Sequence, residues 1–249
     1  ERHAEQLASV SQLRADQVAA WLQERQRQAD FARSSVYMGG LWQQWRRTGD
    51  EAVHQQLMAR LSGLRDNLGG RTVFLLDRQG RVVSAEHPEQ AQVDDHLQPV
   101  LQQALTSGRV ERTAPRVLAD SAPRRMLDLV APLVHAGAPV PVVAVFRIDA
   151  DRTLFPLLDG WPVPSPSART LLAERRGDQL VGLRGEPAHA LSDPQLHLSR
   201  VLAGPQRVGQ VFEARSFTGE PVLAVVRPVP GADWHLVAHV DLQQLRADT

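Results

Sequence analysis

Two stretches of this sequence share one pattern of turn and strand residues, and this repeat limits the fold more than any other feature. In "VFLLDRQGRVVS", Asp77 and Gly80 lie between two apolar runs. Asp at the start of a tight turn bonds the backbone of the turn, and Gly at its end adopts dihedral angles that other residues avoid. Gly177 takes the same place in a second stretch, "LLAERRGDQLVGL". Both stretches are therefore predicted to be β-hairpins.

The landmarks that follow each hairpin are evenly spaced. Pro132 lies 52 residues after the first glycine, and Pro228 lies 51 residues after the second. Each proline is followed by a further apolar stretch that ends at Asp149 or Asp241, where Asp is suited to begin a helix as its N-cap. Three landmarks in the same order predict a duplicated unit.

The first part of the chain is predicted to be helical. Residues 1–38 contain neither Gly nor Pro, and their apolar residues recur at helical spacing. We expect one long helix that is broken by Gly39-Gly40, followed by two shorter helices. Asp50 is the predicted N-cap of the second of these.

From residue 71 the pattern predicts strands. In the first unit we expect a helix at 97–107 and strands at 71–77, 80–86, 110–119, 125–134 and 141–149. In the second unit we expect a helix at 192–203 and strands at 168–175, 179–184, 207–215, 220–229 and 233–240. The fold class is therefore α+β, with one five-stranded antiparallel sheet and flanking helices in each unit.

The composition excludes several classes of protein. The 28 basic residues are balanced by 28 acidic ones, so nothing indicates a nucleic-acid partner. The chain has no cysteine, which excludes disulfides, thiol catalysis and Cys-based zinc sites. It has no run of 18 apolar residues, and it begins inside a helical pattern without an initiator Met. We interpret it as a fragment of a longer protein.

The sequence resembles double Cache sensor domains, which are tandem PAS-like modules carried by a long N-terminal helix. The resemblance depends on the order of several stretches: "RADQVAAWLQERQRQADFARSS", "FLLDRQGRVVSAEHP", "LDLVAPL", "WPVPSPSARTLLAERRGDQLVGL" and "VPGADWHLVAHVD". It implies helices at 1–70, a membrane-distal unit at 71–158, a membrane-proximal unit at 159–241, and a helix toward the membrane from 242–249. The amino-acid-binding subgroup has an Arg-x-Trp-Tyr element ahead of its central strands, and residues 107–126 contain neither Trp nor Tyr.

The resemblance also implies a place in the cell and a role. Such a domain is the periplasmic or extracellular part of an inner-membrane receptor, with transmembrane helices before residue 1 and after residue 249. The cytoplasmic output of such receptors is a histidine kinase, a diguanylate cyclase or a chemoreceptor signalling region. The long helix has enough apolar surface to pair with its twin, so we expect a parallel homodimer in the full receptor.

Catalytic motifs are absent from the sequence, which has no HExxH, GxSxG, Walker loop or GxGxxG. His235 and His239 are four residues apart on a predicted strand, a span of about 13 Å that is too long for one metal ion. We therefore expect no enzyme activity, no metal and no cofactor.

Asp128 is the residue that most suggests a binding site. Strand alternation places Met126, Asp128 and Val130 on one face, and a carboxylate among apolar neighbours is costly to bury without a partner. The partner is either a ligand's ammonium or hydroxyl group, an Arg such as Arg116, or solvent. The second unit has Ala224 at the corresponding position, so we expect the distal unit to bind the ligand and the proximal unit to transmit the signal.

Other polar residues of the distal unit complete the predicted site. Ser84 follows the first hairpin and lines the rim of the cavity, or it merely ends a strand. Arg116 and Arg125 clamp a ligand carboxylate, or they solvate edge strands. The candidate ligand residues are therefore Asp128, Met126, Val130, Ser84, Arg116 and Arg125.

The sequence thus predicts a non-catalytic sensor that binds a small molecule in the distal unit and passes a helix displacement across the membrane. The alternative is a protein-interaction or dimerisation module whose pockets are closed by its own side chains.

Overall fold

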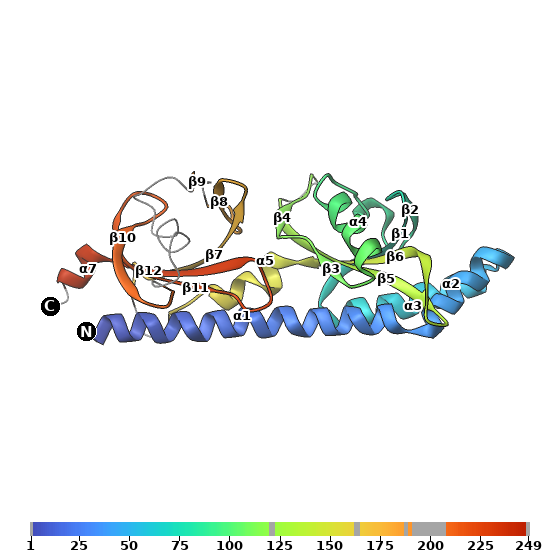
Figure 1. Ribbon diagram of the computed structural model, residues 1–249, viewed down its shortest axis with the longest axis horizontal. Coiled ribbons are helices and arrows are strands. Elements are labelled where there is room, and N and C mark those ends of the chain that lie inside the picture. Colours follow the sequence, from blue (N-terminus) through green and yellow to red (C-terminus); the bar gives the residue numbers. More distant parts are fainter. Residues whose placement is uncertain (1, 120–122, 162–164, 187–188, 191–207, 248–249) are drawn as a thin grey trace. The chain divides into compact units, whose positions relative to one another are not determined.

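The computed structural model describes residues 2–119, 123–161, 165–186, 189–190 and 208–247 (Figure 1). The chain divides into two compact units. Unit I consists of Gln23–Thr153, and unit II combines Glu1–Leu22 with Leu154–Thr249. The finer division at residues 70, 158 and 241 stays a prediction.

Three helices precede the first sheet: α1 spans Arg2–Ser34, α2 spans Val36–Thr48 and α3 spans Glu51–Asn67. The N-cap of α3 is Asp50, whose carboxylate accepts a hydrogen bond from the backbone N–H of Ala52 at 2.9 Å, as predicted. No described helix combines the length and the apolar character that a membrane span requires.

The sheet of unit I is antiparallel, in the order β2-β1-β6-β5-β3, with β4 also paired to β5. Its strands are β1 Gly70–Asp77, β2 Val82–Ala85, β3 Glu111–Arg112, β4 Arg116–Val117, β5 Arg125–His135 and β6 Ala138–Asp149. The turn between β1 and β2 is as predicted. Asp77 Oδ1 accepts from two backbone N–H groups, and Gly80 has φ 82°.

The single strand predicted at 110–119 is wrong, because two short strands, β3 and β4, lie there instead. Pro115 has no N–H to give to a ladder, and Thr113 Oγ1 is engaged in hydrogen bonds with the backbone N–H of Asp128 and with Arg116. The segment therefore bends between two brief pairings with β5, and the sheet has six strands rather than five.

The two faces of this sheet are covered by different helices (Figure 1). Helix α4, Leu97–Ser107, occupies the predicted position and covers one face together with η1, Pro88–Gln90, and the loop after it. Helices α2 and α3 pack against β5 and β1 from the other side. The α4 face is filled by a buried apolar cluster: Phe74, Leu76, Ala91, Leu97, Leu101, Ala104, Val130, Val143 and Val145.

Gly39 and Gly40 do not break the first helix, which corrects the sequence prediction. The break is at Ser35, whose Oγ accepts a hydrogen bond from the backbone N–H of Met38, and both glycines lie inside α2. A Cβ on Gly39 would lie 2.0 Å from the carbonyl oxygen of Val134 in β5. Gly39 therefore serves close helix–sheet packing rather than helix termination.

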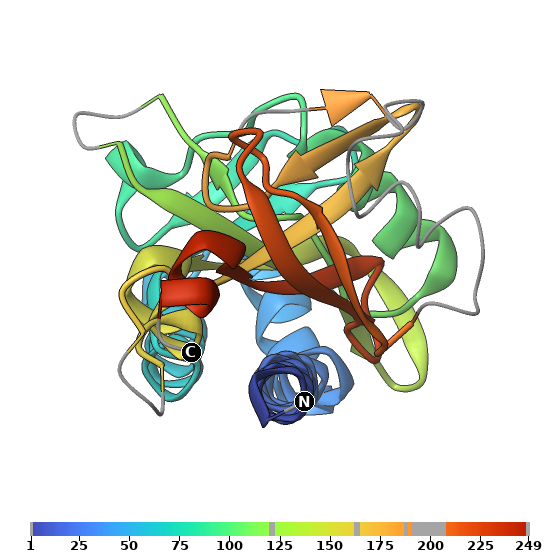
Figure 2. The same cartoon turned by 90° about the vertical axis from the view of Figure 1, so that its left-hand side faces the viewer.

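In unit I, α5 (Ala150–Thr153) follows β6, and in unit II, η2 (Phe155–Leu158) precedes the second sheet. The order of that sheet is β10-β11-β12-β7-β8-β9. Its strands are β7 Arg169–Arg176, β8 Gln179–Gly182, β9 His189–Ala190, β10 Val211–Arg215, β11 Pro221–Pro228 and β12 Trp234–Asp241. Helix α7, Leu242–Ala247, follows and packs on β11 and β12 (Figure 2). The predicted helix at 192–203 lies outside the described residues.

The two sheets repeat one topology, as the duplication predicts. The order β8-β7-β12-β11-β10 in unit II matches β2-β1-β6-β5-β3 in unit I, strand for strand. Gly177 has φ 62° at its hairpin, which is the same left-handed conformation that Gly80 adopts. The differences are at the edge strands, where unit II adds β9 and unit I has β4 beside β3.

Candidate functional site

The candidate site of unit I is centred on Asp128, in the middle of β5 on the face that α4 covers. Its side chain is 0% exposed. The register of the sheet places Asp128 directly opposite Arg147 of β6, which is also on the α4 face and is 2% exposed. Two opposite charges are therefore buried as a cross-strand pair.

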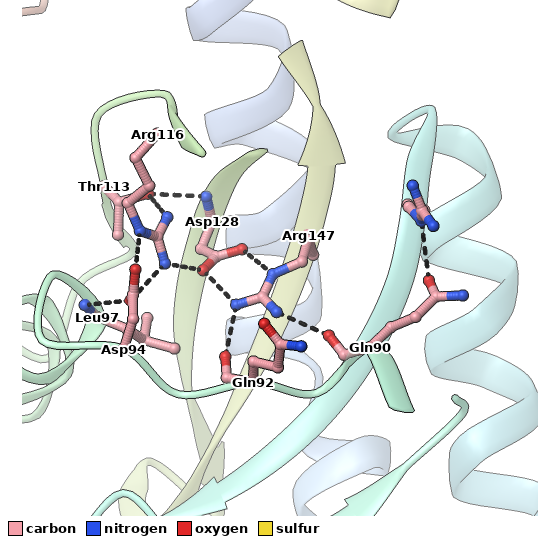
Figure 3. Close-up of polar contacts among 9 residues, drawn as sticks. Gln90, Gln92, Asp94, Leu97, Thr113, Arg116, Asp128 and Arg147 are labelled. Carbon is pink, nitrogen blue, oxygen red and sulfur yellow. Dashed lines mark hydrogen bonds and ion pairs between the residues drawn. The ribbon is translucent and has the colours of Figure 1, made fainter. Parts of the chain in front are cut away.

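Arg147 binds Asp128 through two parallel hydrogen bonds (Figure 3). Its Nε donates to Oδ1 at 2.8 Å and its Nη2 donates to Oδ2 at 2.8 Å. The same guanidinium donates to the carbonyl oxygens of Gln90 and Gln92 at 2.7 and 2.8 Å, and it lies over the ring of Phe74 at 5.0 Å. Arg147 thus fastens the segment before α4 to the central strands.

Arg116 approaches the same carboxylate from the other side (Figure 3). Its Nη2 donates to Asp128 Oδ2 at 2.8 Å, and its Nε and Nη2 donate to the carboxylate of Asp94 at 2.6 and 2.7 Å. Asp94 Oδ1 also accepts from the backbone N–H of Leu97, the first residue of α4, at 3.0 Å. Asp94 therefore binds the start of this helix and also belongs to the ion network.

The network balances two carboxylates with two guanidinium groups. Burial alone would raise the pKa of Asp128, but the charges and hydrogen bonds of Arg147 and Arg116 outweigh it and hold this pKa below its usual value. Burial opposes the charge of Asp94 as well, and Arg116 lowers the pKa of that carboxyl group. Arg116 has a raised pKa, because its two carboxylate partners overcome its own desolvation. Both carboxylates therefore stay charged at neutral pH.

The structure brings four of the six predicted residues together. Asp128 and Arg116 are bonded directly, and Met126 and Val130 are buried on the same face of β5 as Asp128. Of the partners considered for Asp128, Arg116 forms a hydrogen bond with it.

Ser84 and Arg125 lie elsewhere. Ser84 pairs with Leu75 in the register of the sheet, and its Oγ lies 2.7 Å from Nε2 of His54 in α3, on the other face. Arg125 begins β5 and binds Asp151 through its backbone N–H at 2.8 Å and through Nη1 at 3.3 Å.

Sequence analysis missed Arg147 as a partner of Asp128. The available signal was a charged residue inside the apolar stretch "VVAVFRID", which ends β6. In unit II the corresponding cross-strand pair is Ala224 and His239, so the second sheet does not repeat the ion pair.

Within the chain, this network holds the segment before α4 against the central strands. The Asp128 side chain is fully buried, and its carboxylate accepts three hydrogen bonds from two guanidinium groups. A cationic ligand group therefore reaches this carboxylate only if neighbouring side chains move. Within the described part of the chain, no group of three or more His, Asp or Glu side chains is arranged to hold a metal ion.

No protein-family model matches the sequence, and no curated protein sequence matches it significantly. Solved structures are similar over nearly the whole chain. The ligand-binding domain of the Pseudomonas aeruginosa amino acid chemoreceptor PctB, in complex with L-Arg, is 18% identical, with 98% of this chain and 97% of that chain covered and a TM-score of 0.61. The corresponding domain of PctC with GABA is 20% identical, with 96% and 100% covered and a TM-score of 0.61.

A third similar structure comes from another organism. The sensory domain of the Campylobacter jejuni chemoreceptor Tlp3 with isoleucine bound is 14% identical, with 98% and 94% covered and a TM-score of 0.61. The chain therefore has the fold of bacterial chemoreceptor ligand-binding domains, which confirms the fold that the resemblance to double Cache sensor domains implies.

Proposed function

We propose that this chain is the extracytoplasmic ligand-sensing domain of a bacterial membrane receptor and that it has no catalytic activity. The observation that carries this proposal is the similarity of fold over 98% of the chain to a domain solved with a bound amino acid. By analogy, the domain lies in the periplasm and the ligand is a small metabolite. A ligand transmits a signal only if it binds one arrangement of the domain more tightly than another. The coupling free energy between two sites is typically about 1–3 kcal/mol.

A thermal-shift screen tests this function. The panel contains the twenty L-amino acids, GABA, and a wider set of amines and organic acids. A ligand at about 100 times its dissociation constant adds about 2.7 kcal/mol of stability, which raises Tm by roughly 5–10 °C in a domain of this size. A shift with an amino acid supports the class that the similar structures bind, and a shift with another metabolite supports sensing alone. Failure of the whole panel contradicts the sensor function.

The proposed ligand position is the α4 face of unit I, at Asp128, Met126, Val130 and Arg116. Support comes from the buried carboxylate, which is suited to bind a ligand's ammonium group once a guanidinium is displaced. We expect Asp128→Asn, which keeps the shape of the side chain, to weaken binding at least tenfold in calorimetry. Asp77→Asn, which alters an ion pair in the turn between β1 and β2, is the matched control. Unchanged affinity in Asp128→Asn would place the ligand elsewhere.

One observation favours a second function. The α4 face is filled by its own buried side chains, and both oxygens of Asp128 have partners within the chain. This is the arrangement expected of an interaction module with a closed pocket. Such a module would show no thermal shift with any metabolite, and it would bind a protein instead.

The receptor is further proposed to act as a parallel homodimer. Support comes from the large apolar side chains Phe31, Val36 and Tyr37, which are 63%, 53% and 47% exposed at the end of α1 and the start of α2. Analytical ultracentrifugation of the wild type and of Phe31→Glu tests this. A dimer that weakens in the variant is expected, and a wild type that remains monomeric at high concentration would contradict pairing.

A further inference from the structure

A second polar cleft in unit I lies away from the Asp128 network. Its volume is about 630 Å³, and it lies where α3 ends, β1 begins and β6 passes into α5. The charged residues that line it are Asp66, Arg71, Arg124, Asp149 and Arg152. Three arginines and two aspartates therefore line one cleft.

Both carboxylates of the cleft have partners already. Asp149 is 5% exposed, and it accepts from Arg124 Nη1 at 3.3 Å and from the backbone N–H of Arg152 at 3.2 Å. Asp66 is largely exposed and is paired with Arg65 at 3.1 Å. The acidic groups are thus not available to neutralise the remaining two arginines.

Arg71 and Arg152 are left without a carboxylate partner among the described residues. Arg71 donates through Nε to the neutral Oε1 of Gln90 at 3.1 Å, and its Nη1 is buried without an acceptor in the described part of the chain. Arg152 is exposed, and its guanidinium makes no hydrogen bond or ion pair with any described residue. Buried donors in native proteins nearly always have an acceptor, so an acceptor is expected for Arg71 Nη1.

We propose that this cleft binds a small oxyanion, namely a phosphate or the carboxylate groups of an organic acid, between Arg71 and Arg152. Guanidinium groups present paired donors that match the geometry of both kinds of oxyanion. The bound oxyanion neutralises the two unpaired cations, and a small rotation of Arg71 turns its unsatisfied Nη1 toward the ligand. None of the residues that line the cleft binds Asp128 directly, so this site is tested separately from the ligand position proposed at Asp128.

Calorimetric titration of the 249-residue chain tests the site, with inorganic phosphate, citrate and succinate as probes at constant chloride concentration. We expect saturable binding of at least one probe, weakened at least tenfold in Arg152→Gln and in Arg71→Gln. Arg78→Gln, at an exposed arginine in the turn between β1 and β2, is the matched control and should bind as the wild type does.

The probes distinguish the source of the oxyanion: phosphate alone identifies a phosphate site, and citrate or succinate identifies an organic-acid site. Two results would overturn the proposal. One is the absence of binding by all three probes, and the other is wild-type affinity in both Arg71→Gln and Arg152→Gln. The sensor function is tested separately: if an amino acid still raises the Tm of Arg152→Gln, the sensor function holds whatever becomes of the oxyanion site.

Discussion

Removal of Arg147 is the perturbation that most sharply tests the buried network. Arg147→Ala deletes both hydrogen bonds to Asp128, at 2.8 Å each, and it also removes the donor for the carbonyl oxygens of Gln90 and Gln92. Asp128, at 0% exposure, keeps only Arg116. Breaking a buried ion pair by removing one partner costs about 3–5 kcal/mol, because the other charge stays buried. We expect the free energy of unfolding of unit I to fall by that amount.

The assay is urea unfolding followed by tryptophan fluorescence, in which Trp42 and Trp45 of α2 report on unit I. The double variant Arg147→Ala/Asp128→Ala leaves neither charge of the pair, so its loss should be smaller than the sum of the two single losses by about 2 kcal/mol. Arg81→Ala is the matched control. It breaks the pair with Asp77, in which the Arg81 side chain is 76% exposed, and it should cost less than about 1 kcal/mol.

Two outcomes would refute this reasoning. If Arg147→Ala costs no more than Arg81→Ala, the buried pair does not fasten the segment before α4. If the losses of the single variants simply add in the double variant, Asp128 and Arg147 are not energetically coupled.

Three further predictions follow from the same structure. Asp128 has a lowered pKa in the folded protein, so its contribution to stability is fully present above its unfolded pKa of about 3.9 and is lost as the pH falls through its folded pKa. Urea midpoints measured from pH 7 to pH 2 should therefore fall less steeply below pH 4 in Asp128→Asn than in the wild type. Parallel curves for the two proteins would contradict this prediction. Gly39→Ala should destabilise unit I by at least about 1 kcal/mol, because its Cβ meets a carbonyl oxygen at 2.0 Å, whereas Gly63→Ala in α3 meets no atom within 4 Å and should stabilise by about 0.5–1 kcal/mol. Equal effects of the two alanines on the urea midpoint would show that α2 does not need this close approach. In unit II, Arg14→Met should lower the free energy of unfolding by about 1–3 kcal/mol, because Arg14 Nη2 donates to the carbonyl oxygens of Asp159 and Gly160 at 3.0 and 2.8 Å. Unchanged amide hydrogen exchange at residues 157–160 would refute this prediction.

The fold could be predicted where the chemistry of single residues decides the local structure. Asp77 and Gly80 determine a turn, Asp50 caps a helix, and the alternation of β5 correctly places Asp128 with Met126 and Val130. The repeat predicted that both units share one topology, because a duplicated sequence folds twice in the same way, and the strand orders of the two sheets agree with this.

Long-range contacts decided what could not be predicted. From the sequence, Gly39 is expected to break a helix, and only its close approach to Val134 explains why a glycine lies inside α2. Arg116 could be named as a partner of Asp128, but the second partner, Arg147, was hidden by a β-bulge between Pro132 and Val134. Counted back from the hairpin end, where Val134 pairs with Pro139, Asp128 would face Val145, but the bulge shifts the register by two residues and brings Arg147 opposite.

The most direct test of the sensor function is calorimetric titration of the purified chain with each compound that raises the Tm of both the wild type and Arg152→Gln. We expect one saturable binding event, with about one ligand per chain, that is weakened at least tenfold in Asp128→Asn and unchanged in Asp77→Asn. Heats of dilution alone for every such compound would contradict the claim that this domain senses a small molecule.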